Sequence, residues 1–97
     1  MIDLNYYAKL SCRIAIKRGK ISKSIYHAET VESLASELSE YINASEDTPS
    51  EHLPKYTEAQ EELADILIVC LTELNRRNVD VEQIIKYKTE FNIKRIP

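Results

Sequence analysis

Residues 62–71 read ELADILIVCL, and this stretch decides the fold. After its first residue only Asp65 is polar, so a helix formed here is apolar on nearly all of its sides. Such a helix belongs in the middle of a bundle or at a subunit interface, and we expect Asp65 to be buried and Cys70 to act as a small core residue. A β-strand over residues 66–71 is the alternative, and helix-forming residues on both sides disfavour it.

The flanking sequence extends this stretch into a helix over residues 57–78. Thr57 and Gln60 form a capping-box pattern at its start. Shortly after its end, Asp80 is a good N-cap for a last helix over residues 80–94. The second half of the chain therefore predicts two consecutive helices.

The first half predicts two more helices, over residues 3–18 and 24–44. Asp3 is a good N-cap for the first of them, and Gly19, the only glycine, stands where a helix end favours a left-handed residue. Apolar residues at helical spacing predict the second, and the polar, proline-containing segment 45–56 is expected to be a loop. The predicted fold is a single all-α domain over residues 1–97.

Composition agrees with this fold class. One glycine and three prolines are too few for an all-β fold, and 43% hydrophobic with 30% charged residues argues against disorder. A chain of 97 residues is near the lower limit for a self-sufficient core, so we expect it to gain stability by association with itself.

Cysteine usage and hydropathy point to the cytoplasm. Cys12 and Cys70 lack the spacing of a zinc site or a redox pair. Residues 1–10 lack the apolar core of a signal peptide, and the longest apolar run, residues 66–71, is too short to cross a bilayer. We therefore expect a cytoplasmic protein with no membrane partner.

Charge is segregated along the chain. The net charge of −3 combines +5 over residues 1–23, −11 over residues 24–82 and +3 over residues 83–97. The acidic middle of the chain suits a bound metal ion, and the basic residues at both ends of the chain suit phosphate groups bound beside that ion. A solvated acidic face explains the same counts equally well. Nucleic acid is not an expected partner, because no basic run is interleaved with aromatic residues.

Two pairs of carboxylates form the candidate metal site. Glu37 with Glu40, and Glu62 with Asp65, are each three residues apart, so each pair faces one direction from its helix. On neighbouring helices the four would surround one small volume. Ligation by oxygen alone selects Mg²⁺, with Mn²⁺ as the alternative ion.

Spacing alone does not decide between a metal site and a solvated acidic face. The chain holds four acid-x-x-acid pairs, where random placement gives roughly two or three. The expected burial of Asp65 favours a metal, because a buried carboxylate without a partner is costly. The two remaining pairs lie nearer the polar helix ends and are expected to stay in solvent. They are Glu29 with Glu32 and Glu58 with Glu61.

These motifs resemble those of a known family. Residues 36–40 (SELSE), 62–65 (ELAD) and 88–97 (KTEFNIKRIP) are similar in order and spacing to the ExxE…ExxD and terminal K-x-x-x-N-x-x-R-x-P motifs of the MazG-like all-α nucleoside triphosphate pyrophosphohydrolases. The resemblance covers about residues 26–97. It implies a four-helix MazG-like bundle that completes its core by homo-oligomerisation, as a homodimer or a dimer of dimers.

The resemblance also implies an activity. Members of the family use Mg²⁺ to cleave a nucleoside triphosphate between the α- and β-phosphates, giving a nucleoside monophosphate and pyrophosphate, and house-cleaning of aberrant or surplus nucleotides is the role it suggests. Glu37 or Glu40 would hold the attacking water as the catalytic carboxylate. The implied metal ligands are Glu37, Glu40, Glu62 and Asp65, and the implied contacts to phosphate or sugar are Lys88, Asn92 and Arg95.

The three residues implied to contact phosphate or sugar also lie on one side of a helix. Steps of four and three residues place Lys88, Asn92 and Arg95 there. A basic last turn that complements the helix dipole is the alternative explanation. Asn92 fits that alternative less well, since it adds no charge.

Two departures from the family pattern leave a second function open. Ser36 stands where many relatives have a further Glu, and Val69 stands where some have an aromatic residue. The alternative function is therefore a non-catalytic helical dimer that binds nucleotides or regulates a partner.

Overall fold

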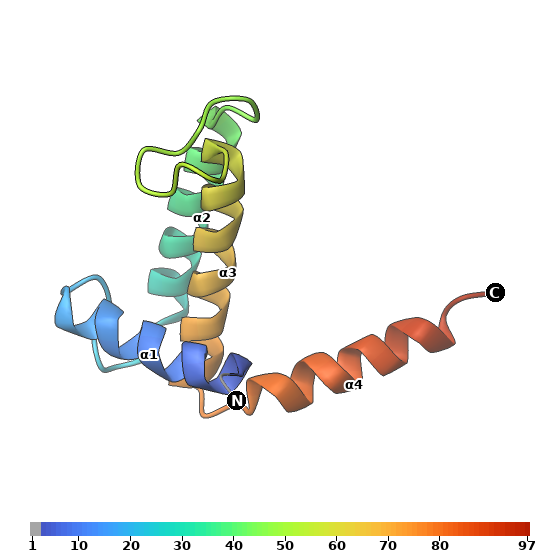
Figure 1. The fold of residues 1–97 in the computed structure, drawn as a ribbon. Coiled ribbons are helices and arrows are strands. Elements are labelled where there is room, and N and C mark those ends of the chain that lie inside the picture. The colour runs from blue at the N-terminus through green and yellow to red at the C-terminus, as the bar shows by residue number, and fades with distance from the viewer. Residues whose placement is uncertain (1–2) are drawn as a thin grey trace. The chain divides into compact units, whose positions relative to one another are not determined.

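The structure is a computed structural model that describes residues 3–97. It is all-helical, and in the described residues it contains no strand, only an isolated antiparallel bridge between Pro49 and Thr57. The predicted all-α class is confirmed (Figure 1). The helices are α1 (Leu4–Lys17), α2 (His27–Asn43), α3 (Glu58–Arg76) and α4 (Val81–Lys94).

The predicted caps of α3 and α4 are present. The Thr57 backbone N–H donates to Gln60 Oε1 at 2.9 Å, and the Gln60 N–H donates back to Thr57 Oγ1 at 3.1 Å. At the start of α4 the Asp80 side chain accepts a hydrogen bond from the Gln83 N–H at 3.1 Å. These bonds satisfy backbone donors that no helical carbonyl can reach.

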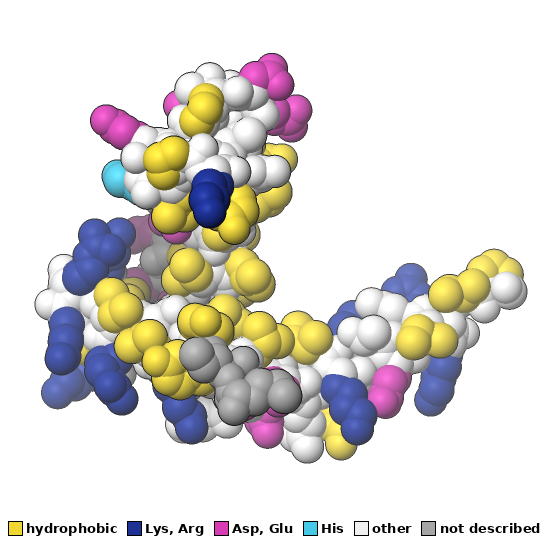
Figure 2. Space-filling view, in the orientation of Figure 1, with side chains coloured by type: hydrophobic (Ala, Val, Ile, Leu, Met, Phe, Trp, Pro, Cys, Tyr) yellow, Lys and Arg dark blue, Asp and Glu magenta, His cyan; other side chains and the backbone are white. Residues whose placement is uncertain are grey.

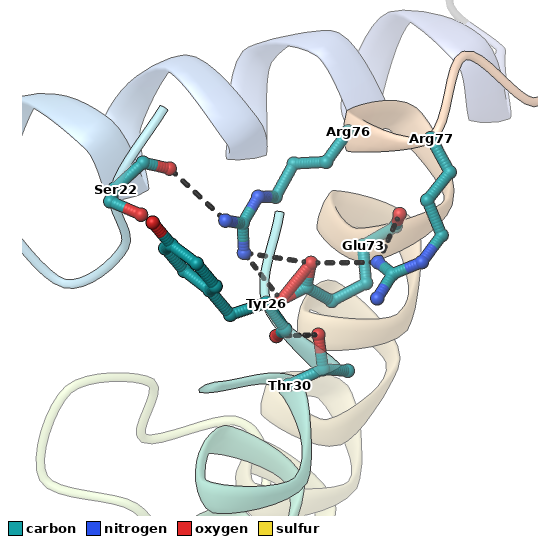
Figure 3. Close-up of polar contacts among 6 residues, drawn as sticks. All are labelled: Ser22, Tyr26, Thr30, Glu73, Arg76 and Arg77. Carbon is teal, nitrogen blue, oxygen red and sulfur yellow. Dashed lines mark hydrogen bonds and ion pairs between the residues drawn. The ribbon is translucent and has the colours of Figure 1, made fainter. Parts of the chain in front are cut away.

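The ends of α1 also agree with the sequence, whereas the start of α2 does not. Asp3 caps α1 through the Tyr6 N–H at 2.8 Å, and Gly19 follows the helix with φ +70°. The segment predicted to begin α2 at residue 24 is not helical, and the helix begins at His27. Its N-cap is Tyr26, whose carbonyl accepts the first helical hydrogen bonds and, at 3.5 Å, one from the Thr30 hydroxyl (Figure 3).

The chain divides into two compact units, each described by itself. The first unit contains residues 3–23 and 71–97, with a core of Ala8, Leu71 and Val81. Asn5 joins α1 to the start of α4: its side-chain amide donates to Asp80 at 2.9 Å, and its oxygen accepts the Val81 N–H at 2.7 Å.

A buried ion pair lies at the end of α3 in this unit. Arg76 Nη1 lies 2.9 Å from both carboxylate oxygens of Glu73, and Nη2 donates to the Ser22 carbonyl at 3.1 Å (Figure 3). The side chains of Arg76 and Glu73 are only 3% and 8% exposed. Arg77 adds a second, more exposed contact to Glu73 at 3.1 Å. The pair ties the last turns of α3 to the segment that follows α1.

The second unit contains residues 24–70, in which α2 runs beside the first part of α3 (Figure 1). The loop between these helices is held to the start of α3. The Glu58 side chain accepts the Ser45 N–H at 3.1 Å, and the Ala59 N–H donates to the Ser45 carbonyl at 3.0 Å. These bonds give the predicted loop a fixed conformation against α3.

The expected burial of α3 is wrong for the single chain. Asp65 is half-buried rather than buried, and Cys70 is exposed. Leu63 and Leu67, which belong to the same apolar stretch, are 51% and 55% exposed. The reason is that one neighbouring helix covers only part of a helix that is apolar on nearly all sides. Within residues 3–97, none of the helices combines the length and the apolar character that crossing a membrane requires.

Candidate metal centre and the adjoining pocket

The carboxylates of α2 and α3 converge in the second unit. Glu37 and Glu40 lie one turn apart on α2, and Glu62 lies on the first half of α3. One carboxylate oxygen from each of the three lies within 4.8 Å of the others. Changes of side-chain rotamer can bring three carboxylates this close together onto one cation, so we call Glu37, Glu40 and Glu62 the carboxylate cluster.

Asp65 lies beside this cluster but is not one of its three members. It follows Glu62 by three residues on α3 and is half-buried. Its negative charge nevertheless acts on Glu62, where it is the second largest cause of the raised pKa. The structure therefore brings together three of the four predicted ligands and places the fourth within electrostatic range.

The carboxyl group of Glu62 has a raised pKa. The pKa of Glu62 is raised to about 7. The largest cause is burial, and the second is the charge of Asp65. A hydrogen bond with Glu40 and the charges of Glu40 and Glu37 contribute less. Its Oε2 atom is buried and accepts no hydrogen bond from the residues described. A carboxylate oxygen in that position is stabilised either by a proton or by a cation. The donor set, oxygen only, fits Mg²⁺ or Mn²⁺.

A pocket of about 410 Å³ adjoins the cluster. It is bounded by the end of α2, the following loop and the start of α3, a region over which Figure 2 shows several acidic side chains. Among the lining residues that the structure describes, His52 alone can carry a positive charge. The acidic residues of the lining are Glu40, Glu51, Glu58, Glu61 and Glu62.

The loop supplies functional groups that the sequence did not predict. The Ser50 hydroxyl donates to Glu61 Oε1, and His52 Nδ1 lies 3.0 Å from Glu61 Oε2. Ser50 is only 2% exposed and also accepts the Leu53 N–H at 3.1 Å. The hydrogen bonds from Ser50 and His52 lower the pKa of Glu61, and the hydrogen bond to Glu61, followed by its charge, raises the pKa of His52.

The expectation that Glu58 and Glu61 stay in solvent is therefore wrong. Both are half-buried, because loop residues far away in sequence fold back onto the start of α3 and donate to them. Only a serine and a histidine in a polar, proline-flanked loop hinted at this arrangement, and no helical spacing rule connects them to Glu61.

Of the predicted phosphate-binding residues, Lys88 and Asn92 lie on α4 and Arg95 is the C-cap that follows it, all in the first unit. Lys88, Asn92 and Arg95 are all exposed. Lys88 Nζ lies 4.7 Å from the centroid of the Phe91 ring, and the Arg95 guanidinium carbon lies 5.8 Å from it. Lys88 and Phe91 also line an open groove of about 450 Å³ together with Tyr87. An aromatic ring thus accompanies the two cations, a feature the sequence did not single out.

Comparison with protein-family models, with curated proteins and with solved structures finds no match to this chain. The carboxylate cluster, its pocket and the resemblance of the sequence motifs are the basis on which a function is proposed.

Proposed function

We propose that this protein is a Mg²⁺-dependent nucleoside triphosphate pyrophosphohydrolase that releases a nucleoside monophosphate and pyrophosphate. The observation that carries the proposal is the carboxylate cluster, in which the pKa of Glu62 is raised to about 7 by burial and by neighbouring acids. Such a cluster is stabilised by a divalent cation. The MazG-like resemblance of residues 26–97 supplies the substrate class.

The residues present fit the ion. Glu62 Oε2 is a buried oxygen with no donor among the described residues, as expected of an atom that binds a cation. When bound, the ion neutralises phosphate charge and makes a bound water more acidic. The residues that would hold it are Glu37, Glu40, Glu62 and Asp65, and Mn²⁺ is the alternative to Mg²⁺.

The side chains then divide the remaining work. Glu37 or Glu40 orients the attacking water and accepts its proton, since both carboxylates lie in the cluster. Lys88, Asn92 and Arg95 bind the phosphates or the sugar and stabilise charge on the leaving pyrophosphate. The substrates in this proposal are aberrant or surplus nucleoside triphosphates.

The protein in this proposal is a homo-oligomer, either a homodimer or a dimer of dimers. Large apolar side chains are exposed on α2 and α3, among them Leu38 (52%), Ile42 (70%) and Leu67 (55%). A domain of this size does not keep so many exposed without a covering surface. A second copy of the chain supplies an equally apolar partner.

The second candidate function is a nucleotide-binding or regulatory dimer without turnover. Ser36, an exposed residue that precedes Glu37 on α2, favours it, because many members of the family have a carboxylate there. This candidate predicts Mg²⁺ and nucleotide binding without pyrophosphate release.

Pyrophosphate release from a panel of standard and modified nucleoside triphosphates distinguishes the two functions. We expect Mg²⁺-dependent release by the wild type and at least a hundredfold loss, on the order of the effect of one catalytic carboxylate, in Glu62→Gln and Asp65→Asn. Glu32→Gln is the matched control, because Glu32 is an exposed glutamate of α2 outside the cluster. Absence of release from every triphosphate, with binding retained, would leave the regulatory dimer.

A further inference from the structure

His52 occupies an unusual position for an exposed histidine. Its side chain is 80% exposed, yet its ring is held by a 3.0 Å contact from Nδ1 to Glu61 Oε2. Glu61 is itself fixed by the hydroxyl of the buried Ser50. The ring is thus oriented from one side by a chain of hydrogen bonds that begins inside the loop.

The contact to Glu61 determines which ring nitrogen is available. A carboxylate only accepts hydrogen bonds, so Nδ1 carries a proton and donates. Nε2 has no partner among the described residues. Protonation of the ring is favoured because the hydrogen bond to Glu61 and its charge, followed by the charges of Glu51 and Asp65, raise the pKa of His52. In the protonated ring Nε2 also carries a hydrogen and is a second donor.

The pocket gives this donor a specific role. His52 lines the same pocket as Glu40 and Glu62, two members of the carboxylate cluster. The rest of the charged lining is acidic and repels a polyphosphate. A bound metal ion would offset part of that repulsion, and the protonated His52 ring at the pocket wall would offset more of it.

We propose that His52 is a substrate-binding residue, whose Nε2–H donates a hydrogen bond to a phosphate oxygen of a metal-bound triphosphate in the pocket beside the carboxylate cluster. Glu61 and Ser50 act as positioning residues that hold the ring. The inference rests on the proposed function for the identity of the triphosphate, but the contact itself is to phosphate.

Two substitutions at His52 separate phosphate binding from loop structure. His52→Asn places an amide nitrogen near the position of Nδ1 and keeps a donor for Glu61, but has nothing at Nε2. His52→Gln places its amide nitrogen near the position of Nε2 instead. His27→Asn is the matched control, since His27 is an exposed histidine in the first turn of α2 and does not line the pocket.

The probe is inorganic tripolyphosphate with Mg²⁺, titrated into the full chain in a calorimeter. We expect His52→Asn to bind it about tenfold more weakly, the size of effect typical of one charged hydrogen bond. His52→Gln regains part of the affinity and His27→Asn equals the wild type, while Mg²⁺ alone binds all four proteins equally. When the substrate is a nucleoside triphosphate that the wild type hydrolyses, we expect His52→Asn to raise KM and to leave kcat little changed.

The inference is overturned if His52→Asn binds tripolyphosphate as the wild type does. It is also overturned if the Asn and Gln variants lose affinity equally and melt earlier, because the histidine is then structural. Failure of the proposed function has a different signature: tripolyphosphate affinity depends on His52, but the wild type releases no pyrophosphate from any triphosphate. Turnover without any measurable tripolyphosphate binding overturns the inference alone.

Discussion

A carboxylate oxygen of Glu62 on α3 lies within 4.8 Å of a carboxylate oxygen of Glu40 on α2. Burial of Glu62 and its acidic neighbours raise its pKa to about 7, so the Glu62 carboxyl group loses its proton only near neutral pH. If the carboxylate cluster binds a metal ion as proposed, the stability of the protein depends on both pH and divalent metal.

In the absence of divalent ions, stability is expected to fall as pH rises from about 4.5 to 7. The folded state binds a proton at Glu62 more tightly than the unfolded chain does, so deprotonation across this range favours unfolding. The measurement is the melting temperature at several pH values in EDTA. Glu62→Gln should make the melting temperature depend less on pH. The raised pKa of His52 also lowers stability as pH rises, so the quantity to compare is the difference in melting temperature between the wild type and Glu62→Gln. A wild-type profile that matches Glu62→Gln contradicts the prediction.

Mg²⁺ at about a hundred times its Kd is expected to raise the melting temperature at pH 7.5 by roughly 10–20 °C. A ligand at a hundred times its Kd adds about 2.7 kcal/mol to the free energy of unfolding, and 1 kcal/mol corresponds to about 4–8 °C in a domain of this size. Differential scanning fluorimetry with and without MgCl₂ measures the shift. It should be lost in Glu62→Ala and kept in Glu32→Ala. A solvated acidic face predicts no shift in any of the three proteins.

The buried ion pair of Glu73 and Arg76 is expected to contribute strongly to stability. Arg76→Ala leaves the Glu73 carboxylate buried with only the Arg77 contact, and removal of one partner from a buried pair typically costs about 3–5 kcal/mol. Urea denaturation followed by circular dichroism gives the change in the free energy of unfolding. Arg77→Ala is the comparison, and its cost should be smaller because its side chain is 32% exposed. Equal costs for the two arginines would show that burial of the pair is unimportant.

Self-association is the fourth prediction. The exposed apolar residues of α2 and α3 should be covered by a second copy, so light scattering at micromolar concentration should give at least twice the mass of the chain, 11.2 kDa. Leu67→Lys, on the exposed side of α3, should shift the protein toward the monomer because it places a charge in an apolar interface. A wild type that is strictly monomeric at this concentration contradicts the proposed oligomer.

The fold was predictable from the sequence where the signals are local. Capping by Asp3 and Asp80, and the reciprocal bonds of Thr57 and Gln60, depend on residues three apart and were identified correctly. The start of α2 was not, because Tyr26 is an N-cap without a side-chain hydrogen bond and leaves no pattern in the sequence.

Burial and the loop contacts depend on residues far apart in sequence, and there prediction failed. Whether Asp65 and Cys70 are buried depends on which elements pack against α3. In the single chain Asp65 is half-buried and Cys70 is exposed. Ser50 and His52 were missed because their partner, Glu61, is about ten residues away and on another element. The carboxylate cluster was foreseeable, since three-residue spacing on two helices needs only that the helices be neighbours.

Product analysis of a single Mg²⁺ reaction tests the central claim most directly. The wild type is incubated with each nucleoside triphosphate, and the phosphorus-containing products are identified by ³¹P NMR, with Glu62→Gln as the negative control and Glu32→Gln as the positive one. We predict that at least one triphosphate yields nucleoside monophosphate and pyrophosphate in equal amounts, in the wild type and Glu32→Gln only. Nucleoside diphosphate with inorganic phosphate, or no product from any triphosphate, would contradict the account.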